Sequence, residues 1–239
     1  AGNDTYYIDV DGDRVVEAAG GGSDTIRTGL IRTILTAGQE IETLQPFNST
    51  LTTAITLIGN EFAQRLFGNA GANVLEGKGG ADTMTGYAGD DIYFVTDAGD
   101  RVIEATGGGR DTIRVGLSSF TLAAGLEIEN LTTELSSATT TRNIYGNEKN
   151  QAIYGNAGSN VLDGKLGNDV LTGNGGRDYF TFSTAPGPTN IDRISDFTVG
   201  TDIIRLENAV FTAIGAAGSL DPDALHRGTA AHDPTDRII

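Results

Sequence analysis

The chain repeats itself at two periods, and the shorter period limits the possible fold more than any other feature. Residues 68–94 read GNAGANVLE, GKGGADTMT and GYAGDDIYF, three nine-residue lines that each open with glycine. Each line has Asn or Asp at its sixth place and a large apolar residue at its eighth. A period of nine is too short for a helical hairpin and does not fit helical spacing. It fits a turn of about six residues followed by a strand of about three.

The longer period is 87 residues. The segment AGNDTYYIDVDGDRVVEAAGGGSDTIR at 1–27 returns as AGDDIYFVTDAGDRVIEATGGGRDTIR at 88–114. In the same way, GNAGANVLEGKGGAD at 68–82 returns as GNAGSNVLDGKLGND at 155–169, and a third copy starts at Gly175. We therefore predict a repeat domain over 1–181, built from unit 1–87, unit 88–174 and the start of a third.

The eighth place of the short repeat is never polar. It is filled by Tyr6, Val15, Ile26, Leu66, Leu75, Met84, Tyr93, Val102, Ile113, Ile153, Leu162, Leu171 and Phe180. One apolar side chain per strand cannot close a core alone, but stacked coils can. The pattern predicts an all-β fold, a right-handed parallel β-roll or β-helix with two nonapeptides per turn. Segments 28–58 and 115–145, rich in Thr, Ile and Leu, are expected to form longer coils of the same stack.

The two ends of the chain differ from the repeats. Residues 182–239 lose the period, which predicts a C-terminal cap that closes the open end of the stack. The chain begins inside a motif without Met and stops abruptly on apolar residues, so we expect a fragment that is trimmed at its C-terminus as well. The sequence has no signal peptide and no run of 18 apolar residues, so no membrane span is predicted.

Composition excludes several classes of function. The 16 Lys and Arg residues against 32 Asp and Glu residues give a net charge of -16. Such a field repels nucleic acid and anionic membranes and attracts cations. With no Cys, the chain has no disulfide scaffold and no thiolate metal site. Because HExxH and GxSxG are absent and His226 and His232 lie outside the repeats, we expect no catalysis in this stretch.

The glycine turns and their sixth-place acids form a candidate ligand set for calcium. Glycine lets the carbonyls of a turn point to one side, and the acid adds an anionic oxygen there. Two such half-sites, one coil apart, offer about six oxygens, the number that Ca²⁺ takes. The alternative is that each Asp only bonds the backbone of its own turn. The calcium interpretation is favoured because nine Asp residues occupy the same place of the repeat: Asp4, Asp13, Asp24, Asp82, Asp91, Asp100, Asp111, Asp169 and Asp178.

The turns match the pattern G-G-x-G-x-D-x-U-x, and the chain resembles the hemolysin-type calcium-binding (RTX) family. GKGGADTMT and GYAGDDIYF are the nearest matches, and the tail DRISDFTVGTDIIRL resembles the segment that ends the β-roll in RTX proteases. The resemblance implies that calcium is held by the Asp and the second- and fourth-place carbonyls of one turn. The coil above would add its first- and third-place carbonyls and its own Asp.

Carried over to this sequence, the resemblance pairs Asp82 with Asp100, Asp91 with Asp111, and Asp4 with Asp24. Weaker sites, each lacking one charge, would join Gln64 to Asp82, Asn73 to Asp91, Gln151 to Asp169 and Asn160 to Asp178. The fourth-place glycines expected at these turns are Gly22, Gly71, Gly80, Gly89, Gly109, Gly158, Gly167 and Gly176.

The resemblance also implies a biological role. It suggests a secreted module of a Gram-negative bacterium, exported unfolded by a type I secretion machine and folded by Ca²⁺ outside the cell, where it supports an upstream domain. One alternative is a calcium-dependent module that binds polysaccharide or a cell surface, as in an adhesin. Another is a non-catalytic part of a secreted protease, lipase or epimerase. An aromatic strip of Tyr6, Tyr7, Tyr93 and Phe94 would favour sugar binding, but the inward places of Tyr6 and Tyr93 favour packing.

Overall fold

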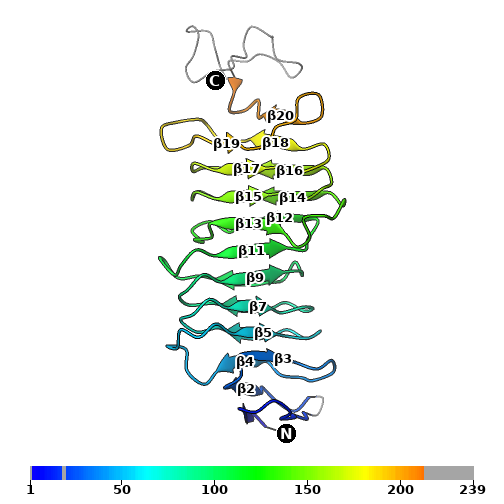
Figure 1. Cartoon of the computed structure of the whole chain (residues 1–239), viewed down its shortest axis with the longest axis vertical. Coiled ribbons are helices and arrows are strands. Elements are labelled where there is room, and N and C mark those ends of the chain that lie inside the picture. Colours follow the sequence, from blue (N-terminus) through cyan, green and yellow to red (C-terminus); the bar gives the residue numbers. More distant parts are fainter. Residues whose placement is uncertain (1, 18–19, 213–239) are drawn as a thin grey trace.

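Short parallel strands stack along one axis in the computed structural model, which describes residues 2–17 and 20–212 (Figure 1). The N-terminal coils lie at one end of the column and β20 lies near the other. Every pairing between named strands is parallel, and the described residues contain no α-helix. No helix in this part of the chain could therefore span a membrane. The prediction of an all-β parallel solenoid is confirmed.

The strands form three sheets, A, B and C. Sheet A contains β1 (Thr5–Ile8), β2 (Thr25–Thr28), β4 (Thr43–Pro46), β6 (Arg65–Phe67), β8 (Thr83–Thr85) and β10 (Arg101–Ile103). Sheet B contains β3 (Arg32–Ile34), β5 (Thr56–Ile58), β7 (Val74–Glu76), β9 (Ile92–Val95), β11 (Thr112–Val115), β13 (Asn130–Thr133), β15 (Ala152–Tyr154), β17 (Val170–Thr172) and β19 (Arg193–Ile194). Sheet C contains β12 (Ser119–Thr121), β14 (Arg142–Tyr145), β16 (Asn160–Asp163), β18 (Tyr179–Phe182) and β20 (Ile203–Leu206).

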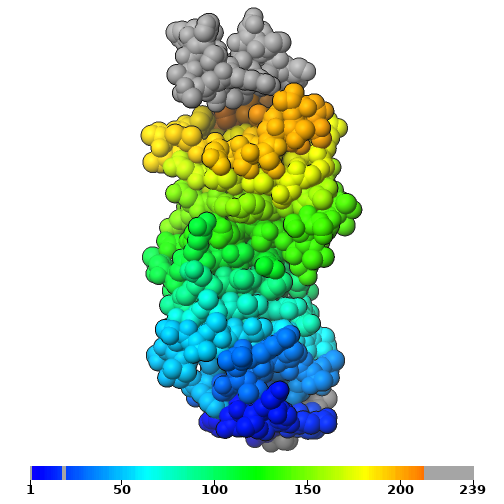
Figure 2. Space-filling view, in the orientation of Figure 1, coloured from blue at the N-terminus to red at the C-terminus, as the bar shows by residue number. Residues whose placement is uncertain are grey.

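From β2 onward, successive strands alternate between the two sides of the coil. Sheet B supplies one side, sheet A supplies the other up to β10, and sheet C takes over from β12. Segments 28–58 and 115–145 contribute β3 to β5 and β12 to β14 to this same stack, as expected. Figure 2 shows the result as successive bands of colour, because each coil contacts mainly its neighbours along the column.

The core consists of the eighth-place side chains in register. On sheet B the register runs Leu57, Leu75, Tyr93, Ile113, Leu131, Ile153, Leu171. All seven are fully buried. Ten of the thirteen predicted positions are buried, and the exceptions are Tyr6, Val15 and Val102, which pack partly against the core. Val102 lies in β10, which pairs with β8 but not with β12, so the next coil does not cover it.

The 87-residue unit contains an odd number of half-turns. Strand β9 lies in sheet B, whereas β18, which follows it by 87 residues, lies in sheet C. Likewise β2 lies in sheet A and its counterpart β11 in sheet B. Corresponding residues of the two units therefore face opposite sides of the column.

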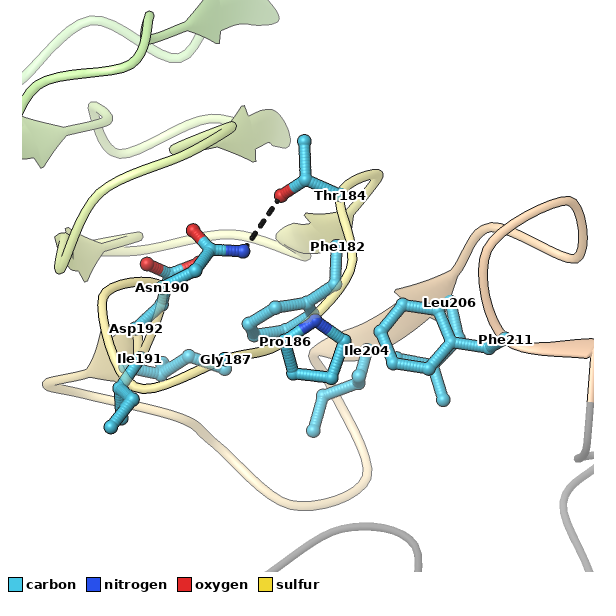
Figure 3. A pocket seen from close by; sticks show the side chains of 11 residues that line it. Phe182, Thr184, Pro186, Gly187, Asn190, Ile191, Asp192, Ile204, Leu206 and Phe211 are labelled. Atoms are coloured by element: carbon cyan, nitrogen blue, oxygen red, sulfur yellow. Dashed lines mark hydrogen bonds between the residues drawn. The ribbon is translucent and has the colours of Figure 1, made fainter.

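The stack continues past residue 181. Strands β19 and β20 add one coil in register, with Ile194 beside Leu171 and Ile204 beside Phe180. Next to this coil lies an apolar hollow of about 440 Å³, lined by Phe182, Pro186, Ile191, Ile194, Ile204, Leu206 and Phe211 among others (Figure 3). Residues 213–239 of the predicted cap lie outside the described residues, and a domain boundary at 182 stays a prediction.

Candidate metal-binding turns

A ladder of backbone-to-carboxylate hydrogen bonds joins the turns of successive coils. The N–H of most sixth-place residues donates to the sixth-place acid one full turn later, as Gln64 does to Asp82 Oδ1 at 2.7 Å. The same bond joins Asp4 to Asp24, Asn73 to Asp91, Asp82 to Asp100, Asp91 to Asp111, Gln151 to Asp169 and Asn160 to Asp178. The structure therefore brings every predicted pair of sixth-place residues together on neighbouring coils.

Four acids belong to this ladder but were missed by the sequence interpretation. They accept the same bond from Asp24, Asp111, Asp169 and Asp178, and they are Glu42, Glu129, Asp192 and Asp202. Their signal was present, because each stands two places before an apolar residue that lies in the core register: Leu44, Leu131, Ile194 and Ile204. The turn before each differs in length from the nonapeptide, which hid the phase.

The glycine-rich turns fall into two conformational classes. In the aspartate turns, residues 77–82, 86–91, 164–169 and 173–178, both the second and the fourth residue have positive φ. These residues are Lys78 and Gly80, Tyr87 and Gly89, Lys165 and Gly167, Asn174 and Gly176, with φ between 68° and 112°. In the amide turns, residues 59–64, 68–73, 146–151 and 155–160, no residue has positive φ. Alternate left-handed residues turn neighbouring carbonyls to one side, as a cation-binding turn requires.

The fourth-place glycines are required by close stacking on the preceding coil. A Cβ at Gly80 would lie 2.6 Å from the carbonyl carbon of Phe62, and one at Gly109 would lie 2.2 Å from the carbonyl oxygen of Gly89. Contacts of this kind occur at all eight predicted glycines: Gly22, Gly71, Gly80, Gly89, Gly109, Gly158, Gly167 and Gly176.

The opening glycine of each aspartate turn leaves room beside the carboxylate. A Cβ at Gly77 would lie 1.9 Å from Asp82 Oδ2, and one at Gly86 would lie 1.9 Å from Asp91 Oδ2. The corresponding distances to Oδ2 of Asp169 and Asp178 are 2.1 Å and 2.2 Å. These oxygens therefore border a small space that glycine keeps free of side-chain atoms.

Three of these oxygens are buried without a hydrogen-bond donor. They are the Oδ2 atoms of Asp82, Asp91 and Asp169, in residues that are at most 1% exposed. Burial raises the pKa of Asp82 and of Asp91 to about 6, although backbone N–H groups oppose the shift. Burial likewise raises the pKa of Asp111 to about 7. A buried carboxylate with a free oxygen is costly, so these residues fit a cation of the hard, oxygen-binding kind.

The described part of the chain supplies no basic side chain to neutralise these acids. Its ion pairs are Lys78 with Glu76, Lys149 with Glu127, and Lys165 with Asp163, and none includes an acid of the ladder. Rows of carboxylates one coil apart repel each other at this spacing. Within this part of the chain, the negative charge of the aspartate turns can therefore be neutralised only by a cation from solution.

In the amide turns, the sixth-place side chain supplies a hydrogen-bond donor where the aspartate turns have none. Asn73 Nδ2 donates to the carbonyls of Asn69 at 3.0 Å and Gly71 at 2.6 Å, lies 3.3 Å from Gly86 O, and donates to Asp91 Oδ1 at 2.8 Å. Asn160 repeats this arrangement on its own turn. The amide nitrogen thus lies among second-, fourth- and first-place carbonyls and an Asp, the oxygen set expected around calcium.

The predicted Asp residues are not all equivalent. Asp13 is exposed, and its Oδ2 accepts the N–H groups of Asp9 and Val10 in its own loop. Asp100 does the same with Thr96 and Asp97. In these two residues, one carboxylate oxygen accepts hydrogen bonds from the backbone of its own turn, as the alternative to calcium binding predicted. Their role as ligands stays a prediction.

Comparison with known proteins agrees with the turn geometry. Residues 58–100 and 145–182 match the family profile described as the RTX calcium-binding nonapeptide repeat, in four copies. No curated protein and no solved structure matches the chain. RTX repeats bind several Ca²⁺ ions and form a non-catalytic β-solenoid, which agrees with the unpartnered carboxylates and the parallel coils. Residues 58–100 and 145–182 therefore carry repeats of the RTX calcium-binding family, and these repeats support a calcium-binding module.

Proposed function

We propose that calcium ions bound between successive aspartate turns hold the coils together and make folding of this module depend on calcium. The observation that carries the proposal is the set of buried Oδ2 atoms without donors at Asp82, Asp91 and Asp169. Carbonyls of the turns would complete each ligand set. The next acids on the ladder, Asp100, Asp111 and Asp192, would contribute from the neighbouring coil.

The free energies expected for calcium binding have the size that a calcium-dependent folding switch requires. Extracellular calcium modules have dissociation constants of about 10⁻⁴–10⁻³ M. At about 1 mM calcium, each site would stabilise the folded chain by about 0.4–1.4 kcal/mol, and at submicromolar calcium by almost nothing. Six such sites would contribute about 2–8 kcal/mol together, which is comparable with the ~5–15 kcal/mol that stabilises a whole domain.

Circular dichroism with and without EGTA tests this proposal. We expect the β-sheet signal to be lost in EGTA, to return when calcium is added in excess, and not to return with magnesium at the same concentration. A β-sheet spectrum that is unchanged in EGTA would overturn the proposal.

The finer role follows from the same switch. A chain that stays unfolded in the calcium-poor cytoplasm can pass a type I secretion machine and fold outside a Gram-negative cell, where it would stabilise an upstream domain. The large negative charge favours the unfolded state until cations bind. Export of a reporter fused before residue 1, through a reconstituted type I machine, tests this role; export that needs no type I component would exclude it.

A second candidate function has its own observation. Tyr7 with Phe47 and Phe67 with Tyr87 form two aromatic pairs in or just after strands of sheet A, with ring centroids 6.0 Å and 6.4 Å apart, respectively. Tyr7 is 67% exposed. Amphipathic rings of this kind can stack on sugar rings. We propose calcium-dependent polysaccharide binding here, tested by a glycan pulldown with Tyr7→Ala and with Tyr154→Ala, on sheet B, as the control.

A further inference from the structure

The eleven-residue step between Asp100 and Asp111 brings a third carboxylate to the turn at Asp91. Oxygens of Asp91, Glu104 and Asp111 all lie within 4.8 Å of one another. The first unit repeats the arrangement with Asp4, Glu17 and Asp24. The nonapeptide pattern has no position that corresponds to Glu17 or Glu104. This position exists only where the step between two Asp residues is two residues longer than nine.

Glu104 is held in place by neighbours that fix both of its oxygens. Tyr93, which is fully buried, donates its hydroxyl to Glu104 Oε2, and the N–H of Ala105 donates to Oε1 at 2.8 Å. Glu104 Oε1 also borders the turn carbonyls, since a Cβ at Gly108 would lie 2.4 Å from it and 2.8 Å from Tyr87 O. The side chain is therefore directed into the turn rather than into solvent.

The free oxygen of Asp91 points into the same space. Asn73 donates to Asp91 Oδ1 from its backbone and side chain, at 2.7 Å and 2.8 Å, so Oδ2 is the oxygen without a donor. A Cβ at Gly86 would lie 1.9 Å from Asp91 Oδ2 and 2.2 Å from Tyr93 Oη, so these two oxygens are at most 4.1 Å apart. Asp91 Oδ2 therefore lies close to the Tyr93 hydroxyl, which donates a hydrogen bond to Glu104.

We propose that Glu104 joins Asp91 and Asp111 in a three-carboxylate calcium site, which has one more charged ligand than the other sites of the aspartate turns and fills first as calcium rises. This inference rests on the proposed function, because it assumes that calcium binds between the coils. Affinity for Ca²⁺ increases with the number of charged ligands, and three carboxylates exceed the one or two at the other turns. Asp4, Glu17 and Asp24 form its counterpart in the first unit.

Calcium titration calorimetry of Glu104→Gln tests the proposal. The change keeps the shape of the side chain and removes its charge. We expect about a ten-fold or greater loss of affinity at one of the tightest sites, with the weaker sites unchanged. Glu17→Gln should affect the counterpart in the same way. The control is Glu207→Gln, because Glu207 is exposed and stands apart from the ladder.

Terbium luminescence gives a second readout that does not depend on Glu104→Gln folding normally. Excited tyrosine transfers energy to a bound terbium ion with a steep distance dependence, and the Tyr93 hydroxyl contacts a proposed ligand. Tyr93→Phe keeps the buried ring and should remove most of the emission of the first terbium ion bound in a Tyr6→Phe background. Tyr87→Phe, on the same turn but stacked outward on Phe67, should keep that emission.

The possible results separate this inference from the proposed function. If EGTA unfolds the chain but the number and the affinity of the tightest calcium sites are unchanged in Glu104→Gln, the three-carboxylate site is wrong and the calcium switch stands. Equal emission from the Tyr93→Phe and Tyr87→Phe variants would also overturn the site. If calcium binds nowhere and EGTA has no effect, the proposed function itself is wrong.

Discussion

Asn73 and Asp82 occupy the same place in consecutive turns, yet only Asn73 carries its own hydrogen-bond donor. The amide of Asn73 lies among four oxygens, whereas Asp82 has an oxygen with no donor at all. A change of one side-chain atom therefore separates a turn that is complete by itself from a turn that needs a cation. We therefore expect the calcium dependence of folding to come from the aspartate turns and not from the amide turns.

Asn73→Asp should convert an amide turn into a calcium-binding turn. Without calcium, the change leaves the carbonyls of Asn69 and Gly71 without a donor and adds a charge beside Asp91, at a cost of about 1–3 kcal/mol. We expect the calcium concentration at the folding midpoint to rise and the calorimetric stoichiometry to increase by one ion. Asn208→Asp, at an exposed position, is the charge-matched control. An unchanged stoichiometry would contradict this prediction.

Gly77→Ala and Gly79→Ala should differ sharply although they change the same turn. A methyl group at Gly77 would lie 1.9 Å from Asp82 Oδ2, whereas at Gly79 the nearest atom would be 3.4 Å away. Overpacking at Gly77 should cost about 1–3 kcal/mol and weaken calcium binding. The change at Gly79 should stay within about 0.5 kcal/mol. Urea unfolding in saturating calcium measures both, and equal losses would show that the space at Gly77 has no role.

At the scale of the elements, the repeated turn and strand were predictable because each carries its own local signal. Glycine marks the turn, and the apolar eighth-place residue marks the strand: Leu75, Ile113 and Leu131 are all fully buried in register. Parallel stacking then follows, because a single inward side chain per strand needs neighbours above and below it.

The parts that escaped prediction depend on coil geometry rather than on local pattern. Asp192 and Asp202 join the ladder although they follow Asp169 and Asp178 by 23 and 24 residues, more than two nonapeptides, so the period alone could not place them. Glu104 lies within 4.8 Å of Asp91 although it belongs to the eleven-residue step, which the nonapeptide pattern does not describe. The donor role of Asn73 was also invisible, since Asn and Asp read alike as sixth-place residues until the hydrogen bonds are known.

The aspartate turns should make stability depend on pH in opposite ways with and without calcium. Burial raises the pKa of Asp82 and Asp91 from 3.8 to about 6, and that of Asp111 from 3.8 to about 7. The folded chain without metal therefore binds more protons than the unfolded chain above about pH 4, and its stability falls as pH rises through about 6 to 7. Acidification from about pH 7 to about pH 5 in EGTA should stabilise the β structure.

With calcium present, protons compete for the same oxygens, so calcium affinity should fall over this pH window. The β-sheet circular-dichroism signal of the calcium-free chain, followed from about pH 7 to about pH 5, and calorimetric affinities in calcium measure the two effects. A β-sheet signal without calcium that does not increase on acidification would contradict the assignment of these carboxylates as buried and unpaired.

At the scale of the whole molecule, each 87-residue unit spans an odd number of half-turns, so equivalent strands of the two units lie on opposite sides of the column. The second unit joins the first with its faces exchanged, β9 on sheet B and β18 on sheet C. The core register of sheet B continues through both units, although sheet A gives way to sheet C after β10. Both sides of the coil therefore accept the same strand, because each presents one inward apolar residue and one glycine turn per half-turn.

Deleting nine residues should consequently preserve the fold, whereas deleting five should not. Removing 77–85 takes out one turn and strand β8, moves every later strand to the opposite side, and lets β9 pair with β6 through Tyr93 and Leu66. Removing 77–81 takes out most of the turn but keeps β8, so it should break the register. In calcium, we expect a native-like β-sheet spectrum and cooperative thermal unfolding for the first deletion and neither for the second. Equal damage from both would mean that the two sides of the column are not interchangeable, and that the odd number of half-turns in each unit has another cause.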